Sequence, residues 1–130
     1  MKRTRKGTWP EDLFRYIKQK NMTPFAWGTH DCATFASGAV EAMTGLCLFE
    51  PTYDNAKDAL RFIEEGGGLE AMVTERLGEP VPVAMRGDVV LIPLEDREVL
   101  GVCLGLEMAA PGEEHLLYYP TARASKAWRV

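Results

Sequence analysis

The chain has 130 residues, a net charge of −4 and a pI near 5.2, which suits one compact domain and excludes a broad basic face for nucleic acid. Hydrophobic residues make up 46% of the sequence, but no apolar run approaches the ~20 residues that cross a bilayer, so membrane insertion is not expected. The three cysteines are widely spaced and neither histidine has a second ligand at zinc spacing. We therefore predict reduced thiols, no metal site and no cofactor.

We expect a single domain over residues 1–130. The basic start, residues 1–8, is typical of a frayed, solvated N-terminus, and no apolar segment follows it as a secretory signal requires. The protein is therefore expected to stay in the compartment where it is made, unless a larger assembly carries it out.

The first half of the chain predicts helices. Thr8 and Glu11 have the spacing of a capping box in front of a helical apolar pattern over residues 10–20. Asp31 is a good N-cap for a second helix that runs to about Met43. This helix is apolar nearly all round, which predicts that it is central and buried.

Two more helices and then several strands should follow. A third helix is expected over residues 54–65 with Asp54 as its cap, and a short fourth helix over residues 69–78. The predicted strands cover residues 88–92, 100–106, 108–110 and 116–119. Helices first and short strands afterwards indicate an α+β domain with a mainly antiparallel sheet.

The segment from Trp27 to Cys32 places a cysteine in the first turn of the buried helix. The unpaired N–H groups and the dipole of a helix N-terminus can stabilise a thiolate, which a cysteine nucleophile needs. The alternative is that Cys32 is a small buried apolar residue, as cysteines commonly are. Trp27 is expected to pack in the core and Gly28 to adopt a positive φ in the turn before the helix.

Three segments occur in a characteristic order. They are Trp27-Gly28-x-x-Asp31-Cys32, then Gly87-Asp88-Val89-Val90, and then Leu100-Gly101-Val102-Cys103-Leu104-Gly105. Over residues 25 to about 111 the chain resembles the NlpC-type cell-wall hydrolases. It looks closer still to a branch of that superfamily found in phages and prophages, which shares a C-terminal tail like Ala127-Trp128-Arg129-Val130. The resemblance implies a papain-like fold, in which N-terminal helices and a central buried helix pack on a small antiparallel sheet.

The resemblance also assigns the catalytic positions. Cys32 stands where the family has its nucleophile. The general base falls at Val99, or at Leu100 if the register slips by one, and the third polar group falls at Ala109 or Ala110. These side chains are apolar, and the Cys–His mechanism cannot run without a base. The resemblance therefore implies a degenerate catalytic triad.

The two histidines are poor substitutes for the missing base. His30 lies at the entrance of the helix, where neighbouring side chains diverge, so it is expected to be a solvent-facing loop residue. His115 opens the last predicted strand, where a turn or strand-end role is expected. Asp31 is interpreted as a helix cap, and Asp88 as a residue that stabilises the turn before its strand.

Two hypotheses about function follow. In the first, the protein is a pseudoenzyme made in the cytoplasm of a bacterial host and incorporated in a virion, as a structural or assembly component of a phage tail tip or baseplate. Its partners would be other tail proteins. In the second, it is a peptidoglycan-directed cysteine endopeptidase or amidase that uses Cys32 with a relocated base. A redox or metal role for Cys47 and Cys103 in a larger assembly is a third alternative.

Overall fold

The computed structural model describes residues 4–130, and within them four α-helices precede five β-strands. The helices are α1 (Trp9–Lys20), α2 (Cys32–Thr44), α3 (Ala56–Glu65) and α4 (Leu69–Leu77). The strands are β1 (Val89–Pro93), β2 (Glu98–Cys103), β3 (Glu107–Pro111), β4 (Leu116–Pro120) and β5 (Lys126–Trp128), with a short 3₁₀ helix η1 (Thr121–Arg123) before β5. The predicted α+β class is confirmed.

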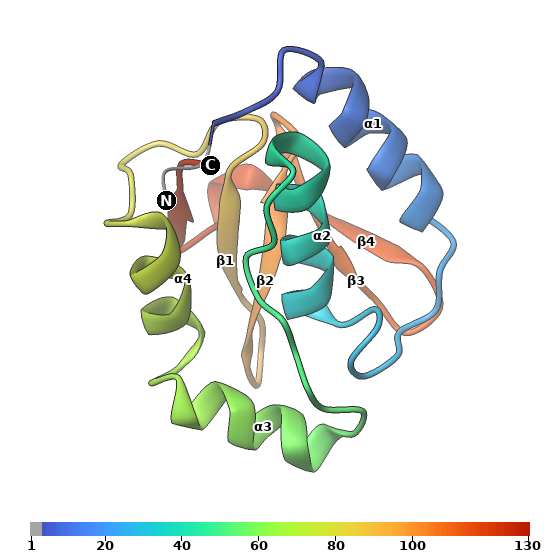
Figure 1. The fold of residues 1–130 in the computed structure, drawn as a ribbon, viewed down its shortest axis with the longest axis vertical. Helices are drawn as coiled ribbons and strands as arrows, with labels where there is room; N and C mark the ends of the chain where they lie inside the picture. The colour runs from blue at the N-terminus through green and yellow to red at the C-terminus, as the bar shows by residue number, and fades with distance from the viewer. Residues whose placement is uncertain (1–3) are drawn as a thin grey trace.

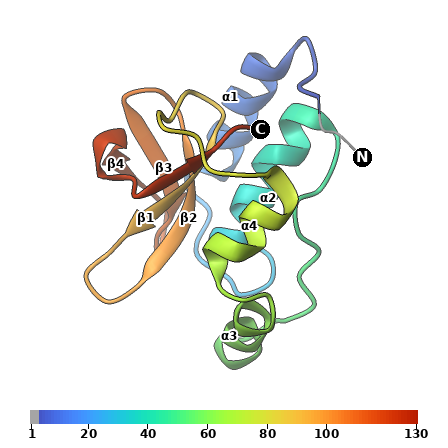
Figure 2. The same ribbon diagram turned by 90° about the vertical axis from the view of Figure 1, so that its left-hand side faces the viewer.

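The strands form one antiparallel sheet in the order β4-β3-β2-β1-β5. The α-helices lie to one side of this sheet, as Figure 2 shows. The prediction of a strand over residues 100–106 is wrong at its end, because the backbone N–H of Leu104 donates to the Glu107 carbonyl and closes a turn. β5 was not predicted, and it pairs with β1 from the far end of the chain.

α2 is the central helix, as its composition predicts. It packs between α1 and the sheet, and seven of its residues are buried. Asp31 caps it through a capping box with Thr34, which confirms the predicted N-cap. Two other predicted caps are wrong. Thr8 donates to the Asp12 carboxylate and makes no side-chain cap, and Asn55, one residue after the expected Asp54, caps α3.

The N-terminal segment is docked against the domain at Arg5 and Lys6. The Lys6 N–H donates to the Met43 carbonyl at 2.8 Å, and Arg5 donates to Asp88 and to the Val130 carbonyl. The expected frayed terminus is therefore wrong at these two residues, because side-chain and backbone hydrogen bonds hold them. Residues 1–3 of that prediction lie outside the described residues.

Asp88 joins both ends of the chain to the start of β1. Its carboxylate is fully buried, pairs with Arg5 at 3.2 Å and Arg129 at 3.0 Å, and accepts from the Met85 N–H. The last of these bonds confirms its predicted role in the turn before the strand. Trp128 is also fully buried and donates through its indole N–H to Thr74, so the C-terminal tail is part of the core.

Candidate active-site cleft

The sheet opens between β2 and β3, and a large cleft lies at this opening. The ladder between the two strands ends at the pair Val102 and Ala109. Two residues further along, Leu100 would face Pro111, which has no N–H to donate. Figure 1 shows the result, with the β1–β2 hairpin running down the view and β3 and β4 slanting away from it. A cleft of about 880 Å³ occupies the space.

Gly101 explains how the strands approach each other just before they part. A Cβ at this position would lie 2.6 Å from the Ala109 carbonyl oxygen and 2.7 Å from the Ile92 side chain. No residue larger than glycine fits there without movement of the backbone. This is the physical reason for a glycine in the third of the sequence segments described above.

Cys32 is the first residue of α2 and lines the cleft, partly buried. Burial raises the pKa of its thiol to about 11, although the backbone amides of Leu100 and Ala33 act in the opposite direction. The helix N-terminus therefore does not produce an activated thiolate, since burial has the larger effect. At neutral pH this thiol is protonated.

The resemblance left two alternatives for each of the other catalytic positions, and the structure shows which of these residues face the helices. Leu100 packs in the same buried cluster as Cys32, on the helix side of the sheet, and Ala109 also packs on that side. Ala110 is in the cluster on the opposite face and Val99 packs against that cluster, although both residues also line the cleft. Because side chains alternate along a strand, Leu100 and Ala109 are the residues that face the helices. Both are apolar and fully buried.

Neither histidine lines the cleft. His30 is 2% exposed and packs edge-on against Phe35, with ring centroids 5.9 Å apart, so the expected solvent-facing position is wrong. Its ring enters the interior because the Ala26 and His30 backbones bond to each other and close a tight loop before α2. Burial lowers the pKa of His30, and its Nε2 has no hydrogen-bond partner among the described residues. His115 is exposed and its Nδ1 bonds to the Leu116 carbonyl.

The Asp31 side chain accepts hydrogen bonds from the backbone on both sides of Cys32. One carboxylate oxygen accepts from the Gly28 N–H and the other from the Thr34 N–H, both at 2.9 Å. Gly28 has a φ of 83°, as predicted, and a Cβ there would lie 2.1 Å from the Tyr53 carbonyl oxygen. Asp31 and Gly28 therefore set the position of Cys32. Both carboxylate oxygens of Asp31 accept hydrogen bonds from the backbone.

Tyr53 is a cleft residue that sequence reasoning missed. It is 7% exposed and lies beside Asp31 and Cys32. Burial, together with the neighbouring Asp31 carboxylate, raises the pKa of Tyr53 above its usual range, so the phenol stays protonated and is no base. It comes from an irregular segment between α2 and α3, where no periodicity marks a buried residue.

The mouth of the cleft is apolar with charges at its edge. Trp27 is 40% exposed and packs edge-on against Phe25, so its predicted place in the core is wrong. Trp27 lies within the tight turn between Ala26 and His30, rather than in a strand or helix, and its ring lines the cleft instead of the core. Leu60 from α3 and Leu117 from β4 are 57% and 40% exposed. An open apolar rim of this kind is typical of a binding surface.

The remaining thiols are separate from the cleft. Cys103 is fully buried in β2, and Cys47 is exposed and donates to the Glu41 carboxylate. Within residues 4–130, no three His, Cys, Asp or Glu side chains come together in a way that could hold a metal ion. In the same part of the chain, no helix has both the length and the apolar character that crossing a membrane takes.

Comparison with curated proteins gives no match to this sequence. Residues 4–130, almost the whole chain, match a family described as a domain of unknown function, DUF6950. The chain belongs to this family.

Proposed function

We propose that this protein is a papain-like domain of the NlpC type that no longer hydrolyses peptides and acts as a structural or assembly component, in a phage tail tip or baseplate. One observation carries the proposal: the Cys32 thiol lies at the N-terminus of the central helix, facing the sheet, with an apolar Leu100 where a base is needed. A protonated thiol without a base cannot attack a peptide carbonyl.

The phage association rests on the resemblance to the phage and prophage branch. Part of that resemblance lies in the C-terminal Ala-Trp-Arg-Val segment, which also stabilises this fold. Ala127 and Trp128 extend the sheet beside β1, and Arg129 pairs with the buried Asp88. The proposed partners are other tail proteins, which would bind at the apolar mouth of the cleft.

Thiol labelling tests whether the Cys32 thiol is activated as a nucleophile. Cys47→Ser and Cys103→Ala leave Cys32 as the one cysteine, and the iodoacetamide labelling rate is measured across pH, with Cys32→Ser added as the blank. We expect slow labelling that rises only above about pH 9, because the thiolate is the reacting species. A rate already high near pH 6 would show an activated thiolate and overturn the proposal.

A second measurement addresses the peptidase hypothesis directly. Purified peptidoglycan is incubated with the wild type and with Cys32→Ser, and released peptides and free amino groups are counted. We expect the two proteins to give the same background. Release by the wild type that disappears in Cys32→Ser would establish a cysteine endopeptidase or amidase.

A further inference from the structure

The two ends of the long axis carry opposite charge. Figures 1 and 2 both place α1 at one end and α3 at the other. Residues 4–20 contain five basic and two acidic side chains. Residues 54–70 contain five acidic and two basic ones, and residues 95–98, which run from the β1–β2 turn into the start of β2, add three acidic and one basic. The molecule is therefore an electrostatic dipole along its length.

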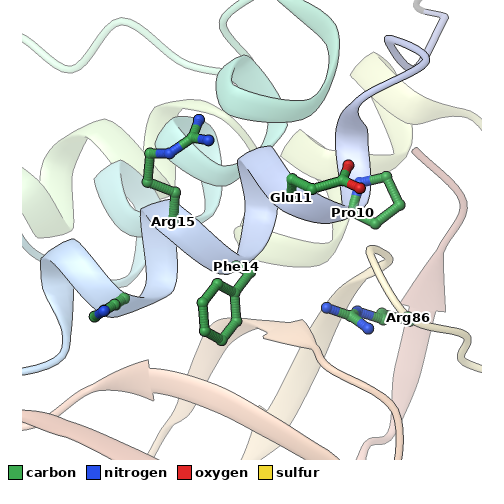
Figure 3. Close-up of a pocket in the computed structure, with 6 residues that line it drawn as sticks. Pro10, Glu11, Phe14, Arg15 and Arg86 are labelled. Carbon is green, nitrogen blue, oxygen red and sulfur yellow. The ribbon is translucent and has the colours of Figure 1, made fainter.

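The basic end presents an exposed aromatic side chain. Phe14 projects from α1 and is 62% exposed, although the core-facing residues of the same helix, Leu13 and Ile17, are buried. Figure 3 shows Phe14 and Arg86 at a hollow beside α1, which has a volume of about 510 Å³. Three of the residues that line this hollow are basic and one is acidic. This end is a cationic surface with an apolar centre.

The acidic end presents a hollow with an apolar rim. The mouth of the Cys32 cleft is framed by Leu60, Trp27 and Leu117, whose exposures are given above. Two of the charged residues that line it, Glu98 and Glu113, are exposed carboxylates on opposite walls, one on β2 and one on the β3–β4 turn. An apolar side chain flanked by cations has the size and charge to enter this mouth.

We infer that the chain associates head to tail with a second copy of itself, the α1 face of one copy docking through Phe14 into the Cys32 cleft of the next. The cations beside Phe14 would then face the carboxylates of the cleft and of α3. Using the cleft as a docking surface rests on the proposed function. The contact joins two different surfaces, so it is heterologous. Further copies can add to the free surfaces, which gives a ring if the rotation closes and an open filament if it does not.

Sedimentation of the full chain tests the association. The mass is measured at concentrations from about 10 to about 500 μM, in about 50 mM and about 500 mM salt. We expect a mass that rises above the 14.5 kDa of one copy with concentration, and a smaller rise in high salt because charge pairs are screened. A mass of one copy throughout would overturn the inference.

Two variants test the orientation. Phe14→Ser removes the docking side chain, and Leu60→Ser alters the cleft mouth. Each is expected to stay at one copy alone, and an equimolar mixture is expected to give a species of two copies and nothing larger. The reason is that the intact Phe14 of one variant fits the intact cleft of the other. Leu106→Ser is the matched control, since Leu106 is 93% exposed and lines neither surface.

Other outcomes would contradict the inference in identifiable ways. A mixture that does not associate would mean that like surfaces pair, or that the two sites are not partners. A wild type that stays at one copy but binds vesicles of anionic lipid through Phe14 would assign the basic face to a lipid surface. None of these results bears on hydrolysis, which the peptidoglycan measurement decides separately.

Discussion

Asp31 and Asp88 are both buried carboxylates, 2% and 0% exposed, and each stands where a helix or strand begins. Asp88 meets two arginines, one from each end of the chain. Asp31 meets backbone N–H groups and lies beside a protonated thiol and a protonated phenol. Around Asp88, the buried negative charge is compensated by ion pairs with the two arginines. Around Asp31, burial raises the pKa of the Cys32 thiol and of the Tyr53 phenol, which is the basis of the proposed loss of cysteine catalysis.

The largest expected effect in this comparison comes from removing the paired charge. Asp88→Ala leaves Arg5 and Arg129 without their partner and removes the ion pairs that connect both terminal segments to β1. Since removing one partner of a buried pair is strongly destabilising, we expect unfolding free energy to fall by about 3 kcal/mol, measured in urea. Asp96→Ala is the control, because its ion pair is exposed, and it should change stability by less than about 0.5 kcal/mol. Equal effects would refute the anchoring role.

Removing the other carboxylate should cost less. Asp31→Ala deletes the helix cap and leaves the N–H groups of Gly28 and Thr34 without acceptors, so we expect a loss of about 2 kcal/mol. Asp31→Asn keeps one side-chain oxygen and should lose less than half of that. If the asparagine variant is as unstable as the alanine variant, the negative charge itself is required and the capping explanation fails.

The thiol environment can be changed by introducing a base. Leu100→His places an imidazole on the strand face that packs with Cys32. We expect iodoacetamide labelling of Cys32 at pH 7 to rise about tenfold, because a nearby imidazolium favours the thiolate. Ile92→His is the matched control, since Ile92 is as buried as Leu100, packs on the opposite face of the sheet and does not line the cleft, so the rate should be unchanged. Val99→His, whose side chain lines the same cleft as Cys32, tests the alternative register. A larger effect from Val99→His would reverse the register assignment.

The smallest effect concerns His30. Burial lowers its pKa in the folded protein, whereas the unfolded chain has an ordinary value near about 6.5. The unfolded state therefore binds more protons as pH falls below that value, and stability is lost on acidification. We expect up to about 1 kcal/mol of this loss between pH 7.5 and pH 6 in the wild type, and its absence in His30→Phe. Identical pH profiles for the two proteins would exclude this contribution.

Local features of the sequence predicted much of the fold. The apolar periodicity located four helices, the Asp31 cap located the start of the central one, and the shift to short β-branched runs predicted the antiparallel sheet. These predictions succeed because caps and periodic patterns depend on residues within a few positions of each other. They placed Cys32 at the start of a buried helix, which is where it lies.

The remaining features depend on contacts between distant parts of the chain. The pairing of β5 with β1 and the docking of Arg5 on Asp88 involve partners that no local pattern marks. The sequence left Val99 and Leu100 as alternatives for the base position. Only the register of β2 against its neighbours shows that Leu100 faces the helices, because a shift of one residue along a strand moves every side chain to the other face of the sheet.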